Sequence, residues 1–468
     1  MKKIYILLWI VLVTSSFAFN KIPPKQSQEA CKNRPEGTKC SFMGPRGNEL
    51  GTCAYTPNNK YYSCRPNRDN KQDNQYNKPN GKKRNNGEKY SIEQAISDNA
   101  QLHTISFAAM SFMSSNLCEM SFLPPGKHAS YFGFQYLRDV IGANAGHEQN
   151  FVPHVANNLL YILTNKQKAI LINLAQKQQA KIEKFALMRF PLLISFEKFS
   201  KNEFPYNKNK LDKNQIIKQS AHLYALDGEL SFERAMGFAQ VINSLSPKQT
   251  RYLDQFKTMS YNSWPKRKDQ LDKREFNHEV HIALMTYASE LFSWYIGDVT
   301  KDTYFTPERT ASYFGSYWTK AAPMKAVKRD NYRISIKLTA NSGAEFLRLL
   351  NQKQQSKITQ LVQKQKPYLK QMVTLRESIA KNIREIYKGK TKNSDQIVSL
   401  SRRFGELDGQ IAYLYANTFS SIKNNLSSSE LKKAIKIRNI SQYQCHGVFI
   451  YAEPSAVPNI GDISIFFN

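Results

Sequence analysis

From about residue 90 onward, apolar residues recur at intervals of three and four, with polar and charged residues between them. This spacing is typical of amphipathic helices, and segments that alternate with a period of two are scarce there. The pattern therefore predicts a mainly α fold made of helical bundles. The runs Ile105–Leu117 and Ile282–Ile296 predict apolar helices, and each is followed by a loop rich in aromatic residues.

The helical pattern occurs twice along the chain. Four sequence blocks recur in the same order: ASYFGFQY at 129–136 and ASYFGSYW at 311–318, LTNKQ at 163–167 and LNQKQ at 350–354, ALDGE at 225–229 and ELDGQ at 406–410, and LSPKQ at 245–249 and LSSSE at 426–430. The second copy of each block follows the first at a nearly constant offset along the chain. Because order and spacing are both kept, we predict two tandem diverged helical-bundle repeats, at 100–257 and 279–437.

The segment at 1–18 has the pattern of a secretory signal peptide. Lys2 and Lys3 precede an apolar run from Ile4 to Val13, and small residues follow up to Ala18. A run of about ten apolar residues is too short to span a bilayer, which takes about 20. The sequence therefore predicts an exported protein, periplasmic or extracellular, with no transmembrane segment.

Cysteine spacing predicts a small disulfide-rich β module at 27–66. Four of the six cysteines are clustered in this segment: Cys31, Cys40, Cys53 and Cys64. In an exported chain such cysteines form disulfides, and four of them allow three pairings. A segment this short cannot bury a sufficient apolar core, so the disulfides would stabilise it. The remaining cysteines, Cys118 and Cys445, would tie the end of the chain to the first repeat if they pair.

Two segments differ in texture from the helical body. Residues 67–89 contain no aliphatic side chain, so we predict a disordered linker there. Residues 441–468 contain two short β-type runs, at 445–451 and 463–467, around a connection with proline and glycine. These runs predict a C-terminal strand tail that resembles a β-hairpin.

The chain carries a formal net charge of +30, from 67 basic and 37 acidic residues. Outside the cell this charge favours an anionic surface or ligand as the partner, such as phospholipid headgroups or acidic polymers. The basic residues are scattered along the helices and form no single stripe, which argues against a dedicated nucleic-acid site. The alternative is a lysine-rich solvated surface.

Four of the repeated blocks have the residues of a capping box. In this motif a side-chain oxygen at the N-cap accepts from the amide three residues later, and the Gln or Glu there bonds back. The pairs are Thr164 with Gln167, Ser246 with Gln249, Asn351 with Gln354, and Ser427 with Glu430. Each block therefore predicts the first turn of a helix, and Pro247 suits the first helical position.

LTNKQ at 163–167 also resembles the LTxxQ motif of the Spy/CpxP-like family of periplasmic chaperones and envelope-stress proteins. LSPKQ and LNQKQ are near matches, whereas LSSSE departs at its last position. The resemblance implies a helical, basic cradle that holds unfolded or amphipathic protein clients without ATP. Helix capping accounts for the same blocks without any client.

The YFG blocks predict a ligand site. Aromatic and charged residues gather around them in both repeats: Tyr131, Phe132, Arg138, Glu308, Arg309, Tyr313, Phe314 and Trp318. Such a set suits an aromatic or glycan ligand. The alternative is a packing plug in which the glycines allow close approach of the backbone.

Asp227 and Asp408 occupy equivalent positions in the Leu-Asp-Gly blocks. A carboxylate within a helix can ligate a metal or act as an acid or base. The first repeat has Glu229 two residues later and the second has Gln410, so a symmetric pair of carboxylates is not kept. We therefore expect buried structural acids, with Arg234 or Arg403 as their partners.

His278 and His281 lie three residues apart on a predicted helix and so share a face. With a third ligand they would bind Zn or Cu, although the spacing is not that of the HExxH metalloprotease motif. The alternative is a pair of solvated or hydrogen-bonded histidines. No other cofactor is expected.

The sequence favours a non-enzymatic binding protein. It contains no haem-attachment motif, nucleophile elbow, P-loop or dinucleotide-binding fingerprint. Three readings follow: a chaperone-like binder of protein clients, a ligand or metal binder that uses the YFG loops and His278 with His281, and an enzyme of unrecognised class.

Overall fold

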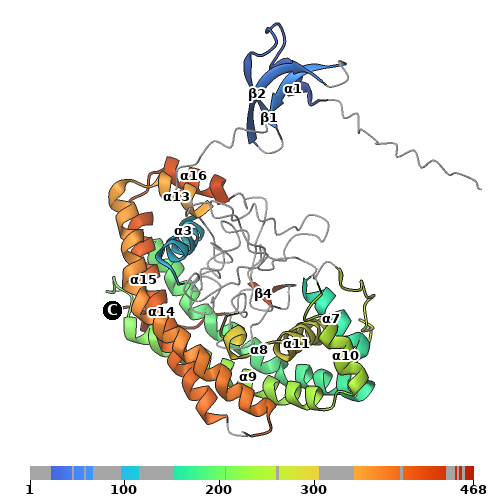
Figure 1. Cartoon of the computed structure of the whole chain (residues 1–468). Helices are drawn as coiled ribbons and strands as arrows, with labels where there is room; N and C mark the ends of the chain where they lie inside the picture. The colour runs from blue at the N-terminus through green and yellow to red at the C-terminus, as the bar shows by residue number, and fades with distance from the viewer. Residues whose placement is uncertain are drawn as a thin grey trace, which may run out of the picture. The chain divides into compact units, whose positions relative to one another are not determined.

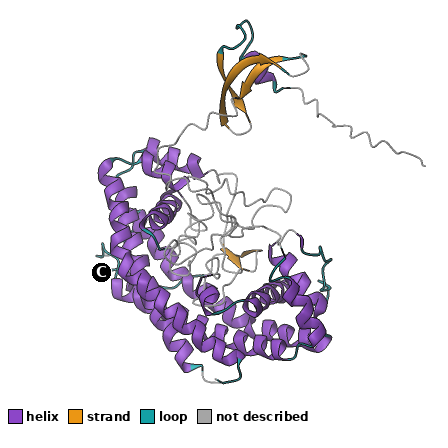
Figure 2. Cartoon of the chain, in the orientation of Figure 1, coloured by secondary structure: helices purple, strands orange, loops and turns teal. Residues whose placement is uncertain are grey.

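Two separate units make up the chain, Met1–Glu88 and Lys89–Asn468 (Figure 1). The computed structural model describes residues 23–44, 47–56, 60–66, 96–114, 151–205, 207–259, 263–304, 342–390, 394–438, 448–450, 453–455 and 459–468. The predicted signal peptide, the predicted linker and both YFG blocks lie outside these ranges. Helices dominate the described part of the larger unit, and the predicted mainly α fold is confirmed (Figure 2).

The smaller unit contains the predicted β module. Helix α1 (Lys25–Glu29) packs against an antiparallel sheet of order β1-β2-β3, with strands β1 (Lys39–Gly44), β2 (Gly47–Tyr55) and β3 (Tyr62–Pro66). The turn before β1 contains Gly37 at a φ of 83°, a conformation that suits glycine.

Two disulfides form the core of this small unit. Cys31 bonds to Cys53, and Cys40 bonds to Cys64. Cys53 and Cys64 also face each other in the β2–β3 register, so the two bonds lie side by side. All four cysteines are buried, and among the described residues of this unit Phe42 is the other buried side chain of the apolar cluster. So small an apolar core leaves the disulfides as the main stabilising element.

Breaking the Cys40–Cys64 disulfide should unfold the small unit alone. Loss of a native disulfide typically costs a small domain about 2–5 kcal/mol, which a core of this size cannot replace. We expect the double substitution Cys40→Ser with Cys64→Ser to abolish amide hydrogen-exchange protection in β1–β3. Protection of the helices in the larger unit is the internal control and should be unchanged. A protected sheet in the variant would contradict this assignment.

In the larger unit, helices of similar length recur in the same order. The first repeat contains α3 (Asp98–Ser114), α7 (Phe151–Ile162), α8 (Asn165–Ser200), α9 (Lys213–Asn243) and α10 (Pro247–Gln255). The second contains α11 (His278–Ile296), α12 (Val299–Tyr304), α13 (Ser342–Leu349), α14 (Gln352–Tyr387), α15 (Asp395–Lys423) and α16 (Ser428–Arg438). Helices α8 and α14 are both 36 residues long.

The capping boxes begin these helices, as predicted. At α8, the Gln167 amide donates to Thr164 Oγ1 at 3.3 Å and the Thr164 amide donates to Gln167 Oε1 at 2.9 Å. The same reciprocal bonds begin the three other helices, at the pairs Ser246 with Gln249, Asn351 with Gln354, and Ser427 with Glu430. Pro247 is the first residue of α10, where its missing amide proton is not needed.

Helices α9 and α15 lie side by side and join the repeats (Figure 1). A Cβ on Gly228 would lie 2.8 Å from Ser401 Cβ and 3.0 Å from Val398 Cα. Reciprocally, a Cβ on Gly409 would lie 3.0 Å from Ser220 Cβ and 2.8 Å from Ile217 Cα. These pairs exchange equivalent positions of the two Leu-Asp-Gly helices. The helices therefore cross antiparallel about a local twofold axis, and the repeated glycine lets their backbones touch.

The first helix of each repeat packs on the other repeat. Helix α3 contacts α13, α14 and α16, whereas α11 contacts α7 and α8. Gly343 of α13 permits this approach, since a Cβ there would lie 2.8 Å from the His103 carbonyl oxygen of α3. The two repeats thus exchange their first helices across the α9–α15 axis, so neither repeat has its whole core within its own segment.

The C-terminal tail differs in part from the prediction. Strands β4 (Val448–Ile450) and β5 (Glu453–Ser455) form a short antiparallel hairpin. The second predicted strand, at 463–467, is wrong, because Ser464–Phe466 is a 3-10 turn. Asp462 begins this turn, since its carboxylate accepts from the Ser464 amide at 2.7 Å and from Ser464 Oγ at 2.6 Å. Phe467 then bridges to Leu211, which ties the tail to the segment before α9.

Candidate functional site

The aromatic ligand site predicted from the YFG blocks falls on residues outside the described ranges. This applies to all eight of its members: Tyr131, Phe132, Arg138, Glu308, Arg309, Tyr313, Phe314 and Trp318. The same holds for Cys118 and Cys445. These assignments stay predictions, and the site is built below from the residues that the structure places.

His278 and His281 lie in the first turn of α11, as the helical spacing predicts. Asn277 caps this helix by accepting from the Val280 amide at 2.9 Å. Both histidines are partly buried. Over the described ranges, no group of three or more potential metal-binding side chains includes either histidine. The metal site therefore stays a prediction that still needs a third ligand.

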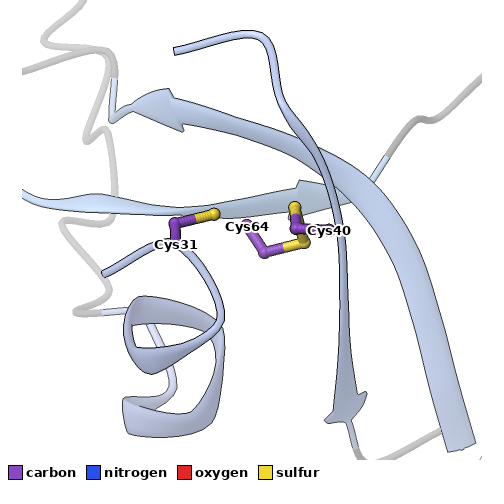
Figure 3. A group of neighbouring side chains, drawn as sticks. All are labelled: Cys31, Cys40 and Cys64. Carbon is purple, nitrogen blue, oxygen red and sulfur yellow. A yellow bond between two sulfur atoms is a disulfide. The ribbon is translucent and has the colours of Figure 1, made fainter. Parts of the chain in front are cut away.

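In the described part of the chain, one group of three side chains has the close spacing of metal ligands, and all three are cysteines. The Sγ atoms of Cys31, Cys40 and Cys64 all lie within 4.8 Å of one another (Figure 3). Each of these sulfurs is in a disulfide, and a disulfide sulfur lacks the thiolate charge that binds zinc. Their proximity follows from the two adjacent disulfides, so the oxidised module offers no metal site at this position.

The glutamines of the LTxxQ-like blocks are buried and used by the fold. Gln167 donates to the Ser244 carbonyl oxygen at 3.1 Å, and Gln249 donates to Gln167 Oε1 at 2.7 Å and to the Ile162 carbonyl oxygen at 2.8 Å. Gln354 repeats the first contact by donating to the Asn425 carbonyl oxygen at 3.2 Å. Each capping glutamine thus also closes the far end of a neighbouring helix. A client would not contact these side chains directly.

The repeated aspartates lie inside the α9–α15 contact, as expected for structural acids. Asp227 is 4% exposed and Asp408 is fully buried. Tyr224, also fully buried, hydrogen-bonds to Asp408. Burial raises the pKa of Tyr224 well above its usual value, and the Asp408 and Asp227 carboxylates raise it further. Tyr224 therefore stays protonated and acts as a hydrogen-bond donor at the junction of the repeats.

Of the two arginines expected as partners of these acids, Arg403 is wrong, whereas Arg234 lies close to Asp227. Arg403 is exposed and pairs with Glu406 on the surface of α15, because the two are neighbours one helical turn apart. Arg234 is buried, its pKa is raised by the nearby Asp227 carboxylate, and it also forms an ion pair with Glu290 of α11.

Arg234 is the centre of a buried polar network between α8, α9 and α11. Its NH1 lies 3.5 Å from Glu290 Oε2, and its Nε donates to Gln178 Oε1 at 3.1 Å. Tyr287 OH donates to the same Gln178 oxygen at 2.6 Å, and the guanidinium carbon lies 4.9 Å from the Tyr287 ring centre. Burial alone would lower the pKa of Arg234, but Tyr287 and the nearby carboxylates raise it on balance. The guanidinium is therefore permanently charged and held on several sides.

The second repeat keeps the glutamine of this network and replaces the arginine. Gln365 of α14 accepts from Tyr415 OH at 2.6 Å and donates to Gln101 of α3 at 2.7 Å. Tyr415 stands where the first repeat has Arg234, at the offset of the Leu-Asp-Gly blocks. The second repeat thus uses a neutral hydrogen-bonded pair where the first repeat uses an ion pair. Each network attaches the exchanged first helix, α11 or α3, to the repeat on which it packs.

A further buried charge pair attaches α12 to α14. Arg384 donates to both Asp302 oxygens, at 2.6 and 2.8 Å, in the bidentate geometry typical of strong ion pairs. Arg376, which is 1% exposed, donates to the Thr303 carbonyl oxygen at 3.0 Å. In both clusters the buried carboxylate, Glu290 or Asp302, faces an arginine of a neighbouring helix. These paired charges therefore stabilise the packing of the helices.

Comparisons with known proteins found no matching family model, no similar curated protein and no similar solved structure. Among the helices that the structure describes, none is both long and apolar enough to cross a membrane.

Sequence reasoning missed the network around Gln178 and the exchange of first helices. A glutamine in a long helix looks like any solvated polar residue, since its burial depends on partners far away along the chain. One signal was available. Gln178 and Gln365 are related by the same offset as the LTNKQ and LNQKQ blocks, which marks the position as retained in both repeats.

Proposed function

We propose that this chain is an exported, non-enzymatic helical protein that binds unfolded or amphipathic protein segments without ATP. The observation that supports this best is the distribution of charge. Glu290 and Asp302 are neutralised by arginines inside the fold, whereas the chain has 67 basic residues against 37 acidic ones. On the described helices, lysines such as Lys166, Lys248 and Lys432 are exposed, where they attract acidic and amphipathic segments.

Apolar side chains on the same helices add to this proposal. Leu187 of α8, Met236 of α9 and Ile435 of α16 are 44%, 38% and 37% exposed. Long apolar side chains among lysines offer contacts to many different sequences, as methionine-rich promiscuous surfaces do. Export rests on the signal-peptide pattern, with which the two disulfides of the small unit are compatible.

The test is suppression of aggregation of a denatured client in the absence of ATP. We expect an equimolar amount of the protein to cut light scattering from an acidic client by more than half, and to act less on a basic client. Raising the salt should weaken the effect on the acidic client, because salt screens surface charges beyond about 10 Å at 0.1 M. If neither client is protected at low salt, the proposal fails.

A further inference from the structure

The connection between the two repeats contains a fixed basic loop. Trp264 anchors its beginning, with its buried ring 4.6 Å from that of Phe256 and 5.2 Å from that of Phe292. Beyond the loop, the Gln270 amide donates to Asn157 Oδ1 at 3.1 Å, and Leu271 is buried. Lys266, Arg267 and Lys268 lie between these anchors. We call this short loop of three consecutive cations, residues 266–268, the arch.

The side chain of Asn158 in α7 holds the arch in place. Asn158 Nδ2 donates both to the Pro265 carbonyl oxygen and to its own helix at the His154 carbonyl oxygen, each at 2.9 Å. Tyr252 of α10 donates to Asn158 Oδ1 at 3.1 Å. One amide therefore links the arch, α7 and α10. A lysine-rich loop that was merely solvated would not need this attachment.

Arg267 is held by tyrosines. Its guanidinium carbon lies 3.7 Å from the ring centre of Tyr161 and 6.0 Å from that of Tyr252, and the structure shows no ion pair to this guanidinium among the described residues. Tyr161 is 46% exposed. The two tyrosines thus fix this partly buried guanidinium in place, and its positive charge adds to that of the lysines on either side of it.

Further cations surround this pair. Lys266 and Lys268 flank Arg267 in the arch, and Lys248 lies one helical turn before Tyr252 in α10. All three are exposed, and none forms an ion pair with a carboxylate in the part of the chain that the structure describes. Met259, which follows α10, is 37% exposed. Positive charge thus occurs together with a half-exposed tyrosine and an exposed methionine.

The second repeat does not keep the residues that hold this arrangement in place. At the offset of the LTNKQ and LNQKQ blocks, Arg348 stands in place of Tyr161, and Ala344 and Glu345 stand in place of the two asparagines that fasten the arch. These three positions therefore differ between the repeats, and the residues that fasten the arch are not part of the shared scaffold.

We propose that this Tyr161–Arg267 arch docks the protein on an anionic phospholipid surface. Lysine and arginine near a membrane are drawn to acidic headgroups, and tyrosine is enriched at the depth of the headgroups because its ring is apolar and its hydroxyl is polar. Charge alone would suit any polyanion, but the tyrosine and the methionine favour a surface with an apolar layer beneath its phosphates. This docking goes beyond the binding of protein clients and does not depend on it.

The test is sedimentation of the full chain with vesicles of phosphatidylcholine, either pure or containing about one-third phosphatidylglycerol. The test variant carries K266Q, R267Q and K268Q together, and a second variant carries Y161A. The matched control carries K432Q, K433Q and K436Q, which removes three exposed lysines from α16, the counterpart of α10. Helical circular dichroism establishes that each variant is folded.

We expect the wild-type chain to sediment with the anionic vesicles and not with the neutral ones. The arch variant should lose at least tenfold in partition coefficient, the control less than threefold, and Y161A several-fold at unchanged charge. Equal losses of partition coefficient in the arch and control variants would overturn the proposal. A Y161A variant that binds the anionic vesicles as strongly as the wild-type chain would overturn it too. Failure to bind anionic vesicles, with retained binding of a single-stranded oligonucleotide through the same three cations, would overturn it in favour of nucleic acid.

Discussion

Replacing Gly405 with alanine should destabilise the larger unit by about 2–4 kcal/mol, at the upper end of the range for overpacked cores. A Cβ at this position of α15 would lie 2.6 Å from the Ser220 carbonyl oxygen and 2.9 Å from Ala221 Cα of α9. Both are backbone atoms of a long, well-packed helix, so neither can turn aside as a side chain would. The two helices would have to separate along the whole contact that joins the repeats.

The matched control is Gly237→Ala, which adds the same methyl group to the partner helix α9. There the nearest atom is the Leu174 Cδ2 methyl at 3.1 Å, which is the mobile end of a side chain. Alanine is favoured over glycine inside a helix by about 1 kcal/mol, so this variant should be neutral or slightly stabilised. Urea unfolding followed by helical circular dichroism gives both free energies. Equal stabilities of the two variants would contradict the close approach at Gly405.

The position of Gly405 also explains how a duplicated helix can pack against its own copy. Tyr224 is its equivalent in α9 at the offset of the Leu-Asp-Gly blocks, and a Cβ on Gly405 would lie 2.8 Å from Tyr224 Cβ. Near a twofold axis, equivalent residues face each other. Two tyrosines would clash there and two glycines would leave a cavity, so one large and one absent side chain solve the packing problem. This solution requires two different sequences, and duplication followed by divergence supplies them.

Local chemistry was predictable from the sequence. The capping boxes at Thr164 and Asn351 fix where the two 36-residue helices begin, because the bonds involved span only three residues. The recurrence of Leu-Asp-Gly predicted equivalent helices, and the clustered cysteines predicted a disulfide module. In each case the information lies within a short stretch of chain or in a comparison of two stretches.

Long-range pairing was not predictable in the same way. Four cysteines allowed three pairings, and the observed bonds Cys31–Cys53 and Cys40–Cys64 depend on how α1 and the three strands pack together. The strand predicted at 463–467 has a β-type composition, but the Asx-type bonds from Asp462 turn it into a 3-10 turn. The exchange of α3 and α11 depends on which surfaces meet across the axis, and no local pattern records that choice.

Removing the guanidinium of Arg234 should destabilise the larger unit by about 3–5 kcal/mol, the cost of breaking a buried ion pair by taking one partner away. The substitution Arg234→Met keeps most of the volume and leaves Glu290, which is 1% exposed, without the cation that faces it. It also removes one of the two donors to Gln178 Oε1 and leaves Tyr287 OH as the other. Since these residues bring together α8, α9 and α11, the expected loss is in the stability of the whole helical unit.

A double-mutant cycle separates the ion pair from the rest of the network. Glu290→Leu alone should also destabilise, whereas the double variant of Arg234→Met with Glu290→Leu should be more stable than the sum of the single effects predicts, by about 2 kcal/mol or more. The second repeat supports this expectation, because Tyr415 and Gln365 form a neutral version of the same contact. The exposed pair Lys381 with Glu377 is the control and should show no comparable coupling. Strict additivity at Arg234 and Glu290 would mean that the ion pair does not stabilise the attachment of α11.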